Sequence, residues 1–182
     1  TRNFKALWEE ACRNYLDPAG HNTTKYNRYL ETPVWKTLER ETIAKTGGSQ
    51  QMDVVSIPSG SGLMIADAKY YHLDYQDSPP EIIGRTPGVN DILKQWAYKK
   101  IIARVCGIER GDIANILLFP HHGSGPDEHL VWPFATVDNQ LMDGTDPVVS
   151  CFVDAEEALD LYARGVVAEP SELDGIYDCV LI

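Results

Sequence analysis

The chain has 182 residues, enough for one domain with a substantial hydrophobic core. Its 27 Asp and Glu residues outnumber its 16 Lys and Arg residues, so the formal net charge at pH 7 is −11. This charge counts against a protein that binds nucleic acid by electrostatic attraction alone, because affinity for the phosphate backbone comes largely from Lys and Arg. No stretch of the sequence approaches the length of a transmembrane helix, so we expect no membrane association.

The cysteines and the first residue indicate the setting of the protein. The four cysteines lie far apart without a C-x-x-C pair, which disfavours a zinc site and indicates reduced thiols in a cytoplasmic protein. A first residue of Thr1 in place of Met indicates a fragment of a longer chain or a processed chain. We expect residues 1–182 to form a single domain.

The N-terminal part of the sequence is predicted to contain two helices. Apolar residues at helical spacing predict an amphipathic helix over residues 3–16, ended by Asp17-Pro18-Ala19-Gly20. Residues 21–35 are polar and are expected to be irregular, and a short helix is predicted from Lys36 to Lys45, before Gly47-Gly48. The expected inward-facing residues of the first helix are Phe4, Leu7, Trp8, Ala11, Cys12 and Tyr15.

A β-hairpin is predicted next. Residues 52–57 and 63–71 are rich in apolar, β-branched and aromatic side chains, which favours two strands. The segment Pro58-Ser59-Gly60-Ser61-Gly62 between them is typical of a five-residue hairpin loop. The simplest register then pairs Ile57 with Leu63.

This register would place Asp53 opposite Asp67. Directly opposed residues of an antiparallel pair have Cβ atoms roughly 4.5–5.5 Å apart, so two carboxylates could share a cation, and Lys69 would point the same way as Asp67. Unpaired carboxylates would repel each other, whereas Mg²⁺ commonly binds one or two of them and completes its shell with water and phosphate oxygens. The pattern therefore predicts a metal-dependent phosphodiesterase. The alternative is a half-exposed strand with ordinary surface salt bridges.

A long helix is predicted from Gly88 to Cys106, after a loop over residues 71–87 that is rich in Pro, Asp and Gly. Its expected inward-facing residues are Val89, Ile92, Leu93, Trp96, Ile102 and Val105. Its basic residues are Lys94, Lys99, Lys100 and Arg104. These basic residues form a candidate DNA-binding strip, and a solvated helix face is the alternative.

The C-terminal part is predicted to contain two strands and a helix. Asn115 to Phe119 is apolar after its first residue, as is typical of a buried strand, and Val148 to Val153 predicts another. Asp154 is expected to N-cap a helix to about Ala163. Residues 120–147 form a connection without a predicted element. Because His121-His122 has no companion ligands at zinc spacing, we interpret it as a loop feature; the alternative is another metallohydrolase that uses both histidines.

The order of helix, hairpin, long helix and strand resembles the core of the PD-(D/E)XK nuclease superfamily. The fold class implied is α/β, a restriction-endonuclease-like core with a mixed central sheet and flanking helices in the order αβββαβ. At a finer level the chain resembles LlaJI-type restriction endonuclease subunits, relatives of the McrC nuclease partner in McrBC-type systems. The segments that carry this resemblance are Leu7-Trp8-Glu9, Pro33-Val34-Trp35, Ile65 to Tyr71 and Pro87 to Tyr98.

The resemblance implies a role for each acid of the hairpin. Asp53 and Asp67 would bind one or two Mg²⁺ ions, for which Mn²⁺ can substitute. Lys69 would position the hydrolytic water and stabilise developing negative charge. Many members add a carboxylate from the first helix; Glu9 is the candidate here, although Glu10 is geometrically equivalent on the helix.

The resemblance also bears on the long helix and on partners. Gln95 would contact the phosphate or an acid ligand, and Tyr98 would pack against the sheet. Asp91, near the N-terminus of the helix, is expected to favour its opening turn. The implied activity is hydrolysis of DNA to 5′-phosphate and 3′-hydroxyl ends, targeted by a nucleotide-hydrolysing AAA+ subunit of the McrB type or by a missing segment. The alternative is a catalytically silent module that docks on such a motor or on DNA.

Overall fold

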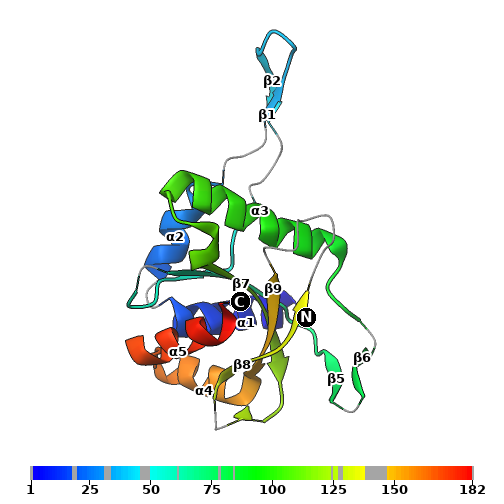
Figure 1. Cartoon of the computed structure of the whole chain (residues 1–182), viewed down its shortest axis with the longest axis vertical. Helices are drawn as coiled ribbons and strands as arrows, with labels where there is room; N and C mark the ends of the chain where they lie inside the picture. Colours follow the sequence, from blue (N-terminus) through cyan, green and yellow to red (C-terminus); the bar gives the residue numbers. More distant parts are fainter. Residues whose placement is uncertain are drawn as a thin grey trace.

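The computed structural model describes residues 2–17, 20–30, 34–45, 50–60, 62–77, 79–83, 85–123, 125–126, 129–137 and 147–181. A five-stranded mixed sheet lies at its centre, with helices on both faces (Figure 1). In sheet order the strands are β3 (Val54–Ser56), β4 (Leu63–Ala68), β7 (Ile113–His121), β9 (Val148–Asp154) and β8 (Val131–Val137). This architecture confirms the predicted α/β fold class.

The predicted hairpin and its register are confirmed. β3 pairs antiparallel with β4, with Val54 opposite Ala66 and Ser56 opposite Met64. Continued by one residue, this register sets Asp53 opposite Asp67. β4 then runs parallel to β7, and β7 parallel to β9, whereas β8 is antiparallel to β9. Among the described residues, the antiparallel unit that precedes the long helix in this sheet therefore has two strands, one fewer than the resemblance implies.

Helices cover the two faces of the sheet (Figure 1). The long helix α3 (Val89–Cys106) packs on one face, where it contributes to the same apolar clusters as alternate residues of the strands. The opposite face is covered by α1 (Arg2–Leu16), α4 (Ala155–Arg164) and α5 (Pro170–Val180). Successive side chains of a strand point to opposite faces, so each strand contributes to both layers of the core. Every residue of β4 and β9 is buried as a result.

The first helix and the long helix are confirmed, but some of their predicted inward residues are not. In α1, Phe4 and Leu7 are exposed, whereas the predicted inward residues from Trp8 onward, Trp8, Ala11, Cys12 and Tyr15, are buried. In α3, Val89, Leu93 and Val105 are exposed. The buried stripe of α3 consists of Ile92, Gln95, Tyr98, Lys99, Ile102 and Ala103. Because polar residues occupy part of this stripe, an assignment based on hydrophobicity alone was wrong at these positions.

Two predictions for residues 21–45 are wrong. A helix, α2 (His21–Asn27), occupies the segment predicted to be irregular, and the Thr23 hydroxyl accepts a hydrogen bond of 2.9 Å from the Val55 backbone N–H of β3. The predicted helix from Lys36 to Lys45 is instead a hairpin of β1 (Val34–Lys36) and β2 (Thr42–Lys45). Arg40 turns this hairpin with φ of 70°, and β-branched and aromatic residues on both sides favour strands. The hairpin projects from the rest of the chain (Figure 1).

Further elements lie where loops were predicted. β5 (Asp74–Asp77) and β6 (Pro80–Ile83) form a small hairpin within residues 71–87. β8 lies within the connection over residues 120–147. Residues 124, 127–128 and 138–146 of this connection fall outside the described residues, as does Gly47-Gly48. A 3₁₀ turn over Arg110–Asp112 precedes β7.

At the C-terminus the predicted helix α4 is confirmed. The Asp154 carboxylate accepts the backbone N–H groups of Glu156 and Glu157 at 3.1 Å each, so it caps the helix as expected. α5 was not predicted.

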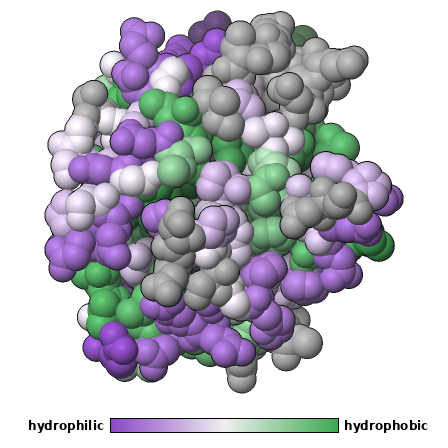
Figure 2. Space-filling view, turned by 60° about the horizontal axis from the view of Figure 1, so that its bottom comes forward, coloured by the Kyte–Doolittle hydropathy of each residue, from purple (hydrophilic) through white to green (hydrophobic). Residues whose placement is uncertain are grey.

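The surface is polar over much of its area. Figure 2 shows one face on which hydrophilic residues predominate and hydrophobic residues lie in separate patches. No described helix combines the length and apolar character needed to cross a membrane. The cysteines are all free, as predicted.

Candidate active site

The hairpin brings Asp53 and Asp67 together on the face of the sheet that α3 covers. Asp67 is buried on β4, and Asp53 directly precedes β3. The Ala68 backbone N–H donates to Asp53 Oδ2 at 2.9 Å, which holds this carboxylate against the partner strand. The predicted juxtaposition of two acids is therefore present in the fold.

Lys69 completes the predicted cluster and has a second partner that the sequence did not reveal. Its Nζ lies 2.5 Å from Asp67 Oδ2 and 2.6 Å from Asp91 Oδ1. The other oxygen of Asp91 accepts the backbone N–H of Gly88, the N-cap of α3, at 3.3 Å. Asp91 thus opens the helix, as predicted, and also orients the ammonium group.

Lys94 is a second cation of the site. Its Nζ donates to Asp67 Oδ1 at 2.8 Å and lies over the Tyr98 ring, 5.5 Å from its centroid. Asp67 therefore has one ammonium group at each carboxylate oxygen. One turn of α3 supplies both Asp91 and Lys94, since residues three apart in a helix lie on the same side.

The two carboxylates have opposite pKa shifts. Burial, together with repulsion from Asp67 and Glu9, raises the pKa of Asp53 to about 6. Burial also raises the pKa of Asp67, but hydrogen bonds from Lys69 and Lys94 outweigh this effect and hold that pKa below its usual value. Asp67 is thus neutralised by the chain itself, whereas Asp53 lacks a full counter-charge. A divalent cation bound by both carboxylates would supply it.

Replacing Asp53 with Asn should stabilise the metal-free protein at alkaline pH. The pKa of Asp53 is higher in the folded state than in the unfolded chain, so the folded state is stabilised while Asp53 is protonated. This stabilisation is lost as the pH rises through about 6 and the carboxyl group ionises. We expect the variant to have a free energy of unfolding higher by about 1–2 kcal/mol near pH 8, allowing for solvent screening, and the gain to vanish near pH 4. Urea unfolding in EDTA across this range measures it. A variant less stable than the parent near pH 8 would contradict the electrostatic assignment.

The structure distinguishes the two candidate acids of the first helix. The Glu9 side chain is 21% exposed and pairs with Lys5 at 3.2 Å, whereas that of Glu10 is 49% exposed and pairs with Arg13 at 3.3 Å. Glu9 lines a cavity together with Asp53, and its charge contributes to the raised pKa of that acid. Of the two acids, Glu9 is therefore the one nearer Asp53, although the three carboxylates of Glu9, Asp53 and Asp67 are not placed to hold one ion together in this conformation.

The cavity beside Asp53 is about 400 Å³ in volume and is lined by two arginines that were not predicted from the sequence as site residues. Arg13 comes from α1 and donates from Nε to the Asp53 backbone carbonyl at 3.3 Å, and Arg28 directly follows α2. Guanidinium groups next to an acid pair are suited to a phosphate that approaches the acids. Arg28 could not be found earlier because its segment was predicted to be irregular.

The predicted residues of α3 are only partly brought to the site. Gln95 has 0% exposure, and its amide nitrogen and oxygen have no hydrogen-bond partner among the described residues. It therefore contacts neither acid by a hydrogen bond in this conformation. Tyr98 packs in the core, as predicted, and its hydroxyl donates to the Gln51 carbonyl at 2.9 Å.

The basic residues of α3 do not form one exposed strip. Lys94 points to Asp67, and Lys99 is only 5% exposed. Lys100 is exposed and lies 3.7 Å from the centroid of the Trp96 ring, and Arg104 is also exposed. Lys99 and Lys100 are adjacent and therefore about 100° apart around the helix axis, so the strip expected from sequence order is divided between two sides of the helix.

The pair His121-His122 does not gather other metal ligands. His121 ends β7, with Nδ1 3.4 Å from the Gly123 carbonyl, and His122 is exposed, 3.8 Å from Glu156. Within the described part of the chain, no group of three or more His, Cys, Asp and Glu side chains is placed to hold a metal ion. The two carboxylates of Asp53 and Asp67 nevertheless fit Mg²⁺, which commonly takes one or two protein carboxylates.

Comparison with known proteins identifies one family. The sequence model described as LlaJI restriction endonuclease matches residues 1–156, which include the hairpin, α3 and all five strands of the central sheet. Neither the curated proteins nor the solved structures contain a match to the chain.

Proposed function

The chain belongs to the LlaJI restriction endonuclease family, and from its candidate site we propose that it is a Mg²⁺-dependent DNA endonuclease. The observation that carries the proposal is the buried cluster in which Asp53 faces Asp67 and the Lys69 ammonium lies 2.5 Å from Asp67. Restriction endonucleases are hydrolases, and this cluster supplies the charges that phosphodiester hydrolysis needs.

Each side chain of the cluster has a distinct role in the proposed reaction. Asp53 and Asp67 would hold one or two Mg²⁺ ions, or Mn²⁺ in their place, with Glu9 as a further carboxylate. Burial lowers the pKa of Lys69, but hydrogen bonds to Asp67 and Asp91 outweigh it and raise the pKa above its usual value. Lys69 therefore stays protonated, and it would orient the attacking water and donate to the developing negative charge instead of removing a proton.

The metal and the cavity complete the proposed chemistry. When bound, Mg²⁺ would lower the pKa of a water molecule and polarise the scissile phosphate. Arg13 and Arg28 would hold a phosphate of the strand being cut, beside Asp53. The products would be a 5′-phosphate and a 3′-hydroxyl.

A partner would supply the affinity for DNA. The net charge of −11 and the division of the basic residues of α3 leave limited electrostatic attraction for a phosphate backbone. We expect Lys100 to contact DNA only once the protein is recruited. Lys94 is paired with Asp67 and Lys99 is buried, so contact of these two candidates with DNA would require their side chains to move. A nucleotide-hydrolysing AAA+ subunit of the McrB type would perform this recruitment.

Metal binding tests the proposal independently of DNA. We expect Mn²⁺ to bind the parent chain in calorimetry or paramagnetic resonance, and the double variant Asp53→Asn, Asp67→Asn to bind it at least about 10-fold more weakly. Asp160→Asn is the matched control, because Asp160 lies on the exposed face of α4, paired with Arg164 at 3.1 Å. In parallel, cleavage of plasmid DNA with Mg²⁺ and the partner should stop on addition of EDTA. Equal Mn²⁺ affinity in the double variant, or tight DNA binding without cleavage, would support a silent docking module instead.

A further inference from the structure

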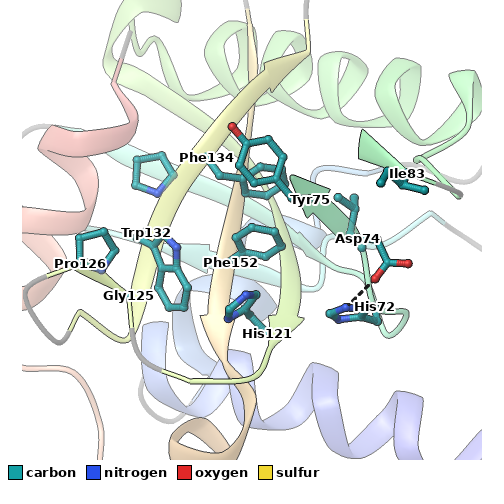
Figure 3. A pocket seen from close by; sticks show the side chains of 12 residues that line it. His72, Asp74, Tyr75, Ile83, His121, Gly125, Pro126, Trp132, Phe134 and Phe152 are labelled. Atoms are coloured by element: carbon teal, nitrogen blue, oxygen red, sulfur yellow. Dashed lines mark ion pairs between the residues drawn. The ribbon is translucent and has the colours of Figure 1, made fainter. Parts of the chain in front are cut away.

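A second cavity, about 570 Å³ in volume, lies at the edge of the sheet where the parallel strands β7 and β9 end. Aromatic rings dominate its lining: Tyr75, His121, Trp132, Phe134 and Phe152 (Figure 3). They come from β5, β7, β8 and β9, so elements far apart in the sequence converge on one space. The acid cluster of Asp53, Asp67 and Lys69 does not include any of these residues.

The cavity and the acid cluster share one face of the sheet. Phe119 of β7 pairs with Phe152 of β9, and Phe152 pairs with Trp132 of β8. The Lys69 backbone N–H donates to the Leu118 carbonyl at 2.8 Å, so the pairing of β4 with β7 continues to the row that contains Phe119. Residues in register on neighbouring strands point to the same face. The aromatic row therefore begins next to Lys69 and runs across the sheet to the cavity.

The rings leave aromatic surface accessible. Phe152 is only 4% exposed and forms the floor of the cavity. The Phe134 ring is stacked on it with 3.9 Å between the ring centroids, and the centroid of the His121 ring lies 4.7 Å from that of Phe152. Trp132, Phe134 and Tyr75 are only half-buried. A planar group that entered would meet ring faces and edges on several sides.

The position of Trp132 depends on Gly125, which also lines the cavity. A Cβ added at Gly125 would lie 2.4 Å from atoms of the Trp132 ring, closer than real Cβ atoms approach. The indole ring thus packs directly against the backbone of residue 125, which is possible only because this residue is a glycine without a Cβ atom. Its placement is therefore specific to this pair of residues.

The polar groups at the rim favour a neutral heterocycle over an anion. His72 Nε2 and Asp74 Oδ1 form an exposed pair at 3.0 Å, on the opposite side of the cavity from Trp132 (Figure 3). Among the described residues that line the cavity there is neither Lys nor Arg, so a phosphate would meet a carboxylate without a permanent cation. The imidazole and carboxylate groups can instead accept and donate hydrogen bonds at the edge of a planar ring.

We propose that this cavity binds one unstacked nucleobase of the DNA strand that the acid cluster cuts. Lys69 and Phe152 lie in register two strands apart in the sheet, roughly 10 Å, which corresponds to roughly three nucleotides at a rise of 3.4 Å each. Base stacking on aromatic side chains is tolerant of sequence, so it would hold the strand in position without large positive charge. The inference rests on the proposed function in one respect, that the substrate is DNA.

The test uses the full chain with Asp67→Asn together with the partner subunit, so that DNA is bound and not cut. Short single-stranded oligodeoxynucleotides carry either 2-aminopurine or an abasic site at successive positions. We expect the 2-aminopurine fluorescence to fall on binding at one position, and an abasic site at that position to weaken binding about 10-fold to 100-fold. Adding Trp132→Ala should remove both effects. Adding Trp35→Ala, on the exposed β1–β2 hairpin, is the matched control and should retain them.

The abasic series keeps the test valid if Trp132→Ala does not fold, because it leaves the protein unchanged. Binding that is equal at all abasic positions, or no binding of single strands, would overturn the proposal. The proposed function fails separately: a parent chain that does not cut DNA, yet quenches 2-aminopurine through Trp132, would retain the base site and lose the nuclease. A parent that cuts DNA with no position-dependent effect would retain the nuclease and lose the base site.

Discussion

Replacing Asp67 with Asn is expected to lower the rate of DNA cleavage by at least about 10³-fold. The amide keeps the size of the side chain but removes its negative charge. In the parent this charge balances two ammonium groups, Lys69 Nζ at 2.5 Å and Lys94 Nζ at 2.8 Å from the Asp67 carboxylate oxygens. Two lysines beside a neutral amide would repel a divalent cation, so the loss would persist at high Mg²⁺. The initial rate of plasmid cleavage with the partner subunit measures the effect.

Two controls separate this loss from unfolding. Asp67 is buried, so removing its charge should also cost about 1–3 kcal/mol of folding stability, which urea unfolding would detect. A domain of this size is expected to remain folded after such a loss. Asp160→Asn, an exposed change on α4, should leave both the rate and the stability unchanged. If Asp67→Asn remains folded and cuts DNA at the parental rate, Asp67 is not part of a nuclease site.

The second large effect is expected from Lys69→Met, which should lower kcat about 10²-fold to 10³-fold without weakening metal binding. The methionine preserves the apolar stem but cannot donate a hydrogen bond to water or to the developing charge. Mn²⁺ affinity should stay equal or rise, because an ammonium group no longer occupies Asp67 Oδ2. Rapid-quench cleavage gives kcat, and calorimetry gives the metal affinity.

This combination of results separates Lys69 from a metal ligand. Loss of Mn²⁺ binding in Lys69→Met would show that the lysine acts by holding the acids in place. Unchanged kcat would show that it does not act in the reaction. Arg164→Met, which removes a surface cation on α4, is the control for loss of positive charge. Asp91 is a positioning residue for Lys69, so Asp91→Asn should lower kcat by less than Lys69→Met does.

The arrangement of Lys69 and Lys94 has a consequence for metal binding. In the metal-free fold both oxygens of Asp67 have an ammonium partner, whereas Asp53 carries the unbalanced charge of the site, with a pKa raised to about 6 by burial and by Asp67. A cation entering the site would therefore be drawn first to Asp53. Metal affinity should consequently rise with pH through about 6, as Asp53 ionises.

The acid pair could be predicted from the chain because its geometry is local. A hairpin with a short loop has one dominant register, and in that register side-chain alternation decides which residues oppose each other. Asp53, Asp67 and Lys69 lie within one hairpin, so no other element was needed to bring them together. The capping of α4 by Asp154 was predictable for the same reason.

The contribution of α3 was predicted less well because it depends on how the helix is rotated on the sheet. Hydrophobic periodicity assigned Val89 and Leu93 to the core, whereas packing buries Gln95 and Lys99 and exposes the two apolar residues. That rotation also directs Lys94 to Asp67, away from the surface on which a basic strip was expected. Periodicity cannot reveal a buried stripe in which polar residues take part.

The local pattern of the chain thus established the hairpin, its register and the acids it opposes, since side-chain alternation and loop length depend on neighbouring residues alone. Only tertiary packing decided that Asp91 and Lys94 join these acids, that Glu9 and not Glu10 shares a cavity with Asp53, and that aromatic rings from four strands meet at one edge. These contacts join residues distant in sequence. Their partners are selected by how helices and strands bury their faces together, which no local pattern specifies.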